Sequence, residues 1–165
     1  MATPKVTLKL LINKKTNKVL FAEAGKDFVD FLFTLLSFPL GTVIKLLSKN
    51  RMVGCLGNLY QSIEELGDAF FQPKIGKATV LNPKIPFRPS EGGFVKGVIT
   101  YMVMDNLEVK PMSTISSITM LNKFNVQEVG ALEEKVIELG MDEGLNLLKA
   151  SLQSQTVLTN VFLGA

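Results

Sequence analysis

The stretch KVTLKLLINKKTNKVLFAEA, residues 5–24, decides the fold of the first half of the chain. Apolar residues occupy every second position of its first part: Val6, Leu8, Leu10 and Ile12. Successive side chains of a strand point to opposite faces of a sheet, so this period of two predicts a strand with one buried face. The polar segment 13–17 suits a hairpin loop, after which residues 18–24 return as a second strand. The sequence therefore predicts an antiparallel hairpin.

Helical patterns follow the hairpin. Asp27 is placed to cap a first helix, whose apolar residues recur at helical spacing: Phe28, Phe31, Leu32 and Leu35. A second helix is predicted from Pro39 to Leu47 and a third over 54–66, with an inward face formed by Leu56, Leu59, Tyr60 and Ile63. Residues 28–47 approach the length of a membrane span, but charged residues, a proline and a glycine interrupt them. We expect two buried helices and no membrane span.

The second half repeats this order of elements. The apolar run 97–104 predicts a buried strand, Asp105 and Asn106 a tight turn, and residues 107–112 a returning strand. The hydroxyl-rich residues 113–117 predict a capped helix. Two further helices are expected over 129–139 and 142–151, the second capped by Asp142 and facing inward with Leu145, Leu148 and Leu152. Residues 156–163 fit either a closing strand or a final helical turn.

These patterns predict an α+β fold made of two units, each a β-hairpin followed by helices. The first lobe covers residues 1–72, a Pro/Gly-rich connecting loop covers 73–93 with a possible short strand at 78–81, and the second lobe covers 94–165. The two lobes either pair their cores or share one compact domain. A shift of 90 residues places Val19 on Val109 and Phe28 on Ile118, which raises the hypothesis of an internal duplication.

The composition excludes several classes of catalytic site. The chain of 165 residues is 47% apolar and 20% charged, as in globular proteins, and it contains no histidine and a single cysteine. Ser–His and Cys–His arrangements and the usual zinc and iron ligand sets are therefore impossible within the chain. We predict no catalytic, metal-binding or cofactor-binding residue. Cys55 lies beside Leu56 and is expected to be a small buried hydrophobe of an intracellular protein, in the cytoplasm or alternatively the nucleus.

Weaker signals for ligand binding also favour structural explanations. Gly25 and Lys26 join a strand to a helix, but the first glycine and the hydroxyl of a phosphate-binding loop are missing. Asp27 and Asp30 share a helix face, where capping and solvation are the default for paired carboxylates. The lysines of the first hairpin have no accompanying set of aromatic residues that could stack on bases. Nucleotide and nucleic-acid binding are both disfavoured.

Four blocks of sequence closely resemble a known family. They are VTLKLLINKKTNKVLFAEAGKDFVDFLFTLLSFPLGTVIKLL (6–47), CLGNLYQSIEEL (55–66), GGFVKGVITYMVMDNLEVKPMSTISSITMLNKFNV (92–126) and GMDEGLNLLKASLQSQTVLTNVFL (140–163). The chain is similar over most of its length to the plant family catalogued as "domain of unknown function 674". This resemblance implies a plant source, but it carries over no activity, substrate or catalytic residue. Longer relatives look as if they have a cysteine-containing insert between the blocks joined at 72–93, which this chain lacks.

Two functions remain open at this point. The absence of catalytic motifs and the number of apolar helix faces favour a non-enzymatic protein-interaction or regulatory module, with a protein partner or self-association through residues 129–151. The alternative is a small-molecule binding protein, or an enzyme, with a site between the two lobes. The hydroxyl-rich helix start offers possible regulatory phosphorylation sites, with plain capping as the other explanation: Ser113, Thr114, Ser116 and Ser117.

Overall fold

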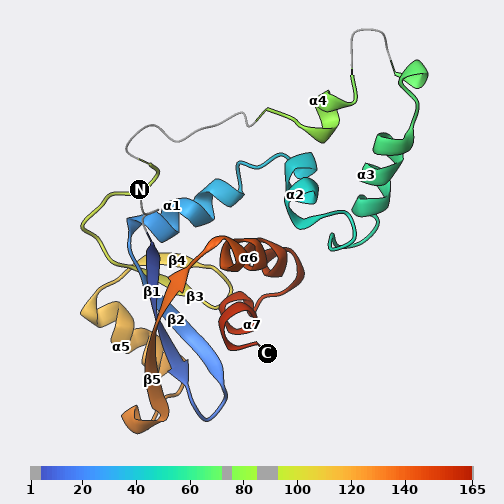
Figure 1. Ribbon diagram of the computed structural model, residues 1–165. Coiled ribbons are helices and arrows are strands. Elements are labelled where there is room, and N and C mark those ends of the chain that lie inside the picture. Colours follow the sequence, from blue (N-terminus) through green and yellow to red (C-terminus); the bar gives the residue numbers. More distant parts are fainter. Residues whose placement is uncertain (1–4, 72–75, 85–92, 165) are drawn as a thin grey trace. The chain divides into compact units, whose positions relative to one another are not determined.

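A computed structural model describes residues 5–71, 76–84 and 93–164 of the chain. In chain order the elements are β1 (Val6–Asn13), β2 (Lys18–Ala24), α1 (Lys26–Leu35), α2 (Leu40–Leu47), α3 (Leu56–Glu65), the 3-10 turn η1 (Asp68–Phe70), α4 (Ala78–Leu81), β3 (Tyr101–Met104), β4 (Val109–Pro111), α5 (Thr114–Lys123), the 3-10 turn η2 (Val129–Ala131), β5 (Leu132–Leu139), α6 (Met141–Gln153) and α7 (Val157–Leu163) (Figure 1). The α+β class predicted from the sequence is confirmed.

The chain folds as two compact units. Unit 1 combines residues 1–33 with 90–165, and unit 2 comprises residues 34–89. This division differs from the predicted lobes 1–72 and 94–165, because the two hairpins belong to one sheet. Strand pairing between β2 and β3 joins segments far apart in the sequence. The Pro/Gly-rich stretch is therefore not the only boundary between compact parts.

Unit 1 is built on a five-stranded antiparallel sheet with the order β4-β3-β2-β1-β5. The predicted hairpin is confirmed as β1 and β2, whose register shifts between Leu11 and Ile12. Leu8, Leu10 and Ile12 are buried as their period of two predicts. The second hairpin, β3 and β4, follows directly in the sheet and turns at Asp105 and Asn106.

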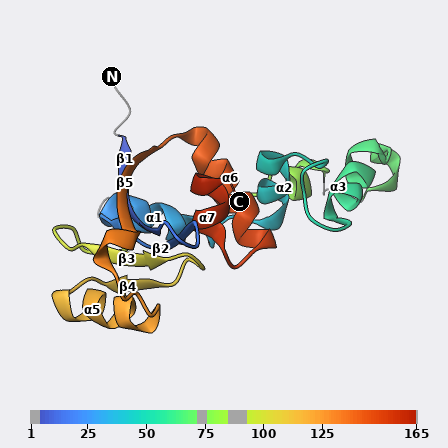
Figure 2. The same ribbon diagram turned by 90° about the horizontal axis from the view of Figure 1, so that it is seen from below.

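Helices cover both faces of this sheet (Figure 2). One face carries Leu8, Leu10 and Ile12 and packs against α1, α6 and α7, whose own buried residues are Phe28, Val29, Leu32, Leu147, Leu148, Val157 and Leu158. The other face packs against α5. The helices that follow the two hairpins, α1 and α5, therefore lie on opposite faces of one sheet.

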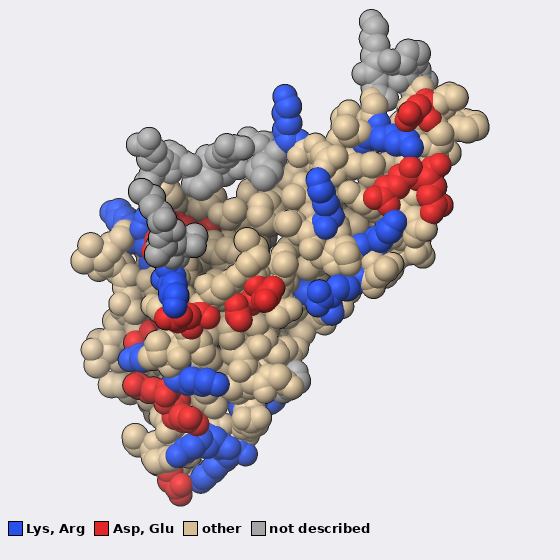
Figure 3. Space-filling model, in the orientation of Figure 1, with Lys and Arg blue, Asp and Glu red and all other residues tan. Residues whose placement is uncertain are grey.

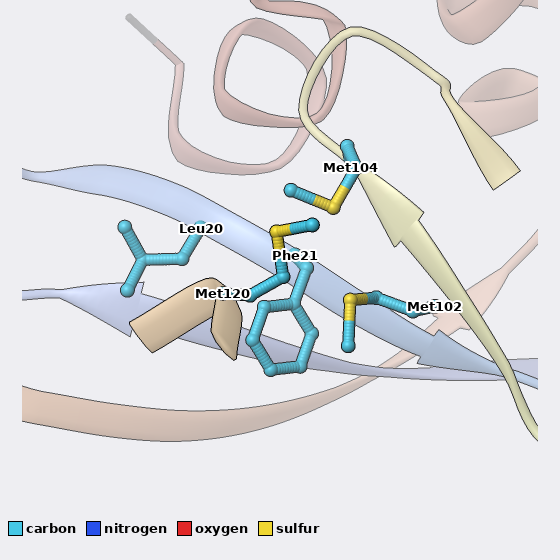
Figure 4. Packing of buried hydrophobic residues seen from close by; sticks show 5 residues of the cluster. All are labelled: Leu20, Phe21, Met102, Met104 and Met120. Atoms are coloured by element: carbon cyan, nitrogen blue, oxygen red, sulfur yellow. The ribbon is translucent and has the colours of Figure 1, made fainter. Parts of the chain in front are cut away.

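The core beneath α5 is rich in methionine. Its buried residues are Leu20, Phe21, Met102, Met104 and Met120, and the three methionine side chains gather around Phe21 (Figure 4). Methionine is unbranched and fills irregular gaps, which suits a layer where a single helix crosses a bulged hairpin. Further apolar residues pack against this cluster from α5, the following loop and β5: Leu121, Val126 and Leu132.

The clearest difference between the predicted and the observed secondary structure lies at residues 129–139. The segment was expected to be a helix, but it forms η2 and then β5, which pairs with all eight residues of β1. Its sequence VGALEEKVIEL suits either conformation locally, and the open edge of β1 selects the strand because pairing there satisfies the backbone of β1. A tertiary contact therefore overrides the local helical pattern.

The remaining helix predictions are confirmed with local corrections. Asp27 does not cap α1, since α1 begins at Lys26 and Asp27 lies in its first turn. Asp142 likewise lies inside α6, where the Gly140 N–H donates to the Glu143 carboxylate at 2.9 Å. In α6 the buried residues are Leu147 and Leu148, whereas Leu152 is exposed. Residues 157–163 form a helix and not a closing strand.

Unit 2 has a small core between α2, α3 and α4. Its buried residues are Val43, Ile44, Leu47, Met52 and Tyr60. The predicted inward face of α3 is only partly confirmed, because Leu59 is 60% exposed. Residues 78–81 form one helical turn and not a strand. Cys55 is exposed, which contradicts the prediction that it is buried.

The apolar stretch 28–47 forms α1 and α2. Among the residues that the structure describes, no single helix is long and apolar enough to cross a membrane. The two helices reach that length and composition only as a pair, and this pair is bent at its break.

Candidate interaction surface

Strand β5 lies at one edge of the sheet and pairs on one side only, with β1, as far as the structure describes the chain. The Lys14 N–H donates to the Ala131 carbonyl at 2.8 Å, which fixes the direction of the backbone groups that follow. In an antiparallel pair of strands, every second residue directs both its N–H and its C=O group to the paired strand, and the residues between them direct both groups to the opposite side. The even-numbered residues of β5 therefore direct their N–H and C=O groups away from the sheet: Leu132, Glu134, Val136 and Glu138.

The side chains of β5 form a charged border around one exposed apolar residue. Val136 is 68% exposed. Lys9 of β1 lies opposite Val136 and contacts two carboxylates, Glu23 at 2.8 Å and Glu134 at 3.5 Å. Lys5 contacts Glu138 at 2.7 Å. Acidic and basic side chains accordingly alternate over β1 and β5 (Figure 3).

The electrostatics of Lys9 follow from this arrangement. Its hydrogen bond to the Glu23 carboxylate raises the pKa of Lys9 against the lowering effect of burial, and the charges of Glu23 and Glu134 add to the rise. Lys9 is therefore fully charged at neutral pH and offsets part of the acidic border. Beside it a shallow trough of about 400 Å³ crosses the sheet, lined by Thr7, Lys9, Glu23, Thr100 and Val136 among others.

We call residues 132–139, together with Thr7, Lys9 and Glu23, the β5 surface. It overlaps the segment 129–151 that the sequence singled out for partner binding, but as an edge strand and not as an amphipathic helix. An exposed edge offers backbone hydrogen-bonding groups in a row, which a helix does not. No signal in the local sequence distinguishes the two, because the edge exists only through the pairing with β1.

A second hollow, of about 520 Å³, lies where the loops of the two hairpins meet. Its lining comes from both halves of the sequence, including Lys18 from the first and Lys123 from the second. Apolar residues contribute to the same lining: Val19, Leu20, Met104 and Phe124. Neither lysine makes an ion pair with another described residue. The hollow combines an apolar surface with two lysines and two carboxylates, Asp105 and Glu108.

The residues weighed as a phosphate-binding loop are engaged in holding the fold. Lys26 Nζ lies 2.5 Å from the Asp30 carboxylate and donates to the Val95 carbonyl at 2.8 Å. Asp30 also accepts the N–H groups of Phe94 and Val95 at 2.8 and 3.0 Å. Lys26 and Asp30 thus fasten the segment before β3 to α1. Asp27 is not part of this contact.

The pKa of Asp30 reflects these bonds. Burial alone would raise the pKa of Asp30, but the bonds from Lys26 and from the amides of Val95 and Phe94 outweigh it and bring the pKa below the ordinary value of 3.8. A carboxyl with a depressed pKa contributes stability above its unfolded-state pKa, and this stability is lost as the pH falls through the folded-state pKa.

Asp30→Asn is therefore expected to lower the free energy of unfolding of unit 1 at pH 7 by about 2 kcal/mol, because bonds to a charged acceptor are replaced by bonds to a neutral one. The difference from wild type should shrink as the pH is lowered below 3.8. Urea unfolding across a pH series measures both effects. Asp27→Asn, on the same turn, is the matched control and should cost under about 1 kcal/mol at pH 7. A constant difference for Asp30→Asn at all pH values would contradict the assignment.

The predicted helix start at residues 113–117 is confirmed. The Ser113 hydroxyl accepts the Ser116 N–H at 3.1 Å, and the Ser116 hydroxyl accepts the Ser113 N–H at 2.7 Å. The Ser117 hydroxyl donates to the Ser113 carbonyl. Ser113 and Thr114 are exposed, and Ser116 and Ser117 are half-buried. Capping is thus a present role of the two bonded serines, and phosphorylation of the four residues stays a prediction.

The described part of the chain contains no group of three or more Cys, Asp or Glu residues placed to hold a metal ion. Neither a curated protein nor a solved structure matches the chain. A family model with the description "Protein of unknown function (DUF674)" matches it twice, at residues 2–91 and 87–165. Two matches are consistent with the predicted internal duplication, in which both hairpins keep their order while α1 and α5 take opposite faces. Since these matches span nearly the whole sequence, the chain belongs to the DUF674 family of proteins of unknown function.

Proposed function

We propose that this chain is a non-enzymatic protein-interaction or regulatory module, working inside the plant cell in the cytoplasm or nucleus, and that the β5 surface binds its protein partner. One observation carries the proposal: an eight-residue strand lies at the edge of the sheet, with Val136 exposed at its centre. Native proteins usually shorten, bend, cover or charge such edges, and β5 carries four charged residues but stays long and regular. A long regular edge with an exposed apolar residue favours a surface that another chain covers.

The reactive side chains support the same conclusion. Lys26 and Asp30 bond to each other and to the segment before β3. Lys9 lies between two carboxylates. Catalytic acids and bases need opposed environments within a cleft that admits a substrate. These groups hold secondary-structure elements together, which favours binding over chemistry.

The test compares two variants of the full chain as bait in plant extract. Val136→Lys places a charge at the centre of the β5 surface, whereas Ile115→Lys places the same charge on α5 at another exposed apolar residue. We expect a defined protein to be retained by wild type and Ile115→Lys and lost by Val136→Lys. Light scattering on the purified chain reports self-association in parallel. A monomer that retains no partner, or retention that Val136→Lys leaves intact, would contradict the proposal.

The alternative, a small-molecule binding protein, is favoured by the hollow between the hairpin loops. Its residues come from both halves of the sequence, as expected for that alternative, and lie within unit 1. Lys18 and Lys123 beside an apolar lining suit a ligand with an acidic group and an apolar body. Thermal-shift screening with small aromatic and aliphatic acids distinguishes the two functions. Stabilisation that Lys18→Ala and Lys123→Ala abolish would favour the alternative.

A further inference from the structure

We propose that the β5 surface binds its partner by strand addition, and that the partner segment is an extended chain with basic residues at positions that face Glu134 and Glu138. This inference rests on the proposed function and specifies how the partner is recognised. It follows from three features of β5: the direction of its backbone groups, the charges along it, and the like charges that oppose pairing with a second copy.

The backbone of β5 supplies the ladder. Residues 132, 134, 136 and 138 direct their N–H and C=O groups away from β1, as the bond between Lys14 and Ala131 establishes. At about 3.4 Å per residue, the span from Glu134 to Glu138 accommodates a five-residue antiparallel segment. Main-chain hydrogen bonds of this kind give affinity, while side-chain positions give specificity.

The charges of β5 oppose a second copy of this chain as the added strand. In a dimer with a twofold axis, β5 would pair antiparallel with β5 of the second copy, and the residues with outward-directed backbone groups would have to face one another. The centre of each such symmetric register is therefore a single residue and not the midpoint between two residues. The register centred on Lys135 places Lys135 opposite itself. The register centred on Val136 places Glu134 opposite Glu138 twice. Like charges directly opposite each other destabilise a strand pair, and these two registers align the most residues of β5.

The same charges define the partner that fits. On the face of the sheet that carries Lys9, the added strand meets Glu134, Val136 and Glu138 in turn. Lysine or arginine opposite each glutamate and a β-branched residue opposite Val136 complement them. On the other face the strand meets Lys135 and Ile137, which an acidic and a β-branched residue complement. Read against β5, this gives the segment Lys-Thr-Val-Glu-Lys.

The probe is the synthetic peptide SGKTVEKGS, labelled for fluorescence anisotropy, and the control is SGETVKEGS with the charges reversed. We expect the basic peptide to bind the full chain about tenfold more tightly than the control, because three attractive pairs, with Glu134, Lys135 and Glu138, become repulsive. On binding, hydrogen exchange should slow at the outward amides of Glu134, Val136 and Glu138, and not at those of residues 135 and 137, which are already paired with β1. Equal binding of the two peptides would overturn the proposal.

Two variants isolate strand addition. Val136→Pro removes only an outward N–H, which an edge strand tolerates, and Val136→Thr keeps it. We expect Val136→Pro to weaken binding of SGKTVEKGS about tenfold and Val136→Thr to leave it within about twofold. If Val136→Pro fails to fold, Glu134→Gln with Glu138→Gln must still reduce the preference for the basic peptide, leaving only the part that Lys135 contributes. Retention of a partner from extract by Val136→Pro, together with its loss from Val136→Lys, would refute strand addition while leaving the proposed function standing.

Discussion

Asp105→Ala is expected to lower the free energy of unfolding of unit 1 by about 3 kcal/mol, because the half-buried Asp105 carboxylate accepts two hydrogen bonds from the buried Thr159. The Asp105 carboxylate accepts the Thr159 N–H and the Thr159 hydroxyl, both at 2.8 Å. The Thr159 hydroxyl in turn accepts the Val19 N–H at 3.0 Å. Thr159 is only 3% exposed, so water cannot easily replace the lost acceptor.

This contact joins three parts of unit 1 that are distant in the sequence. Asp105 lies in the turn between β3 and β4, Thr159 in α7 and Val19 in β2. The Asp105 carbonyl also accepts the Val157 N–H at 2.8 Å, so the first turn of α7 is bonded to this one residue. Substitution with alanine keeps the carbonyl bond and removes the carboxylate, which makes the loss specific to the side chain.

Urea unfolding of Asp105→Ala, Asn106→Ala and Thr159→Val measures the effect. Asn106 is the matched control, since among the described residues its side chain accepts only the nearby Glu108 N–H, at an exposed site, and its loss should cost under about 1 kcal/mol. The double variant Asp105→Ala with Thr159→Val should be less destabilised than the sum of the two single variants. Full additivity, or equal losses for Asp105→Ala and Asn106→Ala, would contradict the assignment.

The sequence could predict those elements whose signals are local. The alternation at Leu8, Leu10 and Ile12 specifies β1, because a period of two has one explanation in a half-buried sheet. The serines at residues 113–117 likewise specify the start of α5, since a cap forms between residues three positions apart. In both places the residues that determine the structure lie next to one another in the sequence.

The sequence could not predict elements that depend on distant partners. Residues 132–139 become a strand only because β1 presents an open edge more than a hundred residues earlier, and their own spacing also fits a helix. The burial of Leu147 in place of Leu152 depends on how α6 lies on the sheet, which its periodicity leaves open. The division into two units has the same origin, since the pairing of β2 with β3 draws the second hairpin into the first sheet.

The candidate site shows the same difference between features with local sequence signals and features that depend on distant residues. The sequence singled out residues 129–151 for partner binding, which stays a prediction, and it assigned residues 129–139 a helix where the structure has η2 and β5. Lys26 and Asp30 were recognisable as a lysine and a carboxylate on one helix, yet their bonds to residues 94 and 95 form only in the folded chain. Composition therefore identifies reactive groups, whereas the tertiary structure decides whether they are available.

Gly57→Ala is expected to destabilise unit 2 by about 3 kcal/mol, the upper range for overpacking at a buried contact. A Cβ atom at Gly57 would lie 2.0 Å from the Lys49 carbonyl oxygen and 2.9 Å from its carbonyl carbon. Real Cβ atoms do not approach backbone atoms this closely, so α3 would have to move away from the end of α2. The ion pair between Lys49 and Glu64, at 2.7 Å, resists that movement by joining the same two segments.

The expected loss of stability is opposite in sign to the usual effect of replacing glycine with alanine in a helix. Alanine is normally the better helix former, and glycine-to-alanine substitution within a helix usually stabilises it by about 1 kcal/mol. Gly67→Ala, just beyond the end of α3, is the control for the added methyl group, because among the described residues a Cβ there would meet the Phe70 ring at 3.7 Å. Hydrogen exchange should accelerate over residues 40–66 in Gly57→Ala, remain near wild type in Gly67→Ala, and be unchanged in the sheet of unit 1 in both. Normal exchange in Gly57→Ala would mean that α3 does not meet the segment after α2 as described, since the three nearest atoms at this contact all belong to the backbone of Lys49.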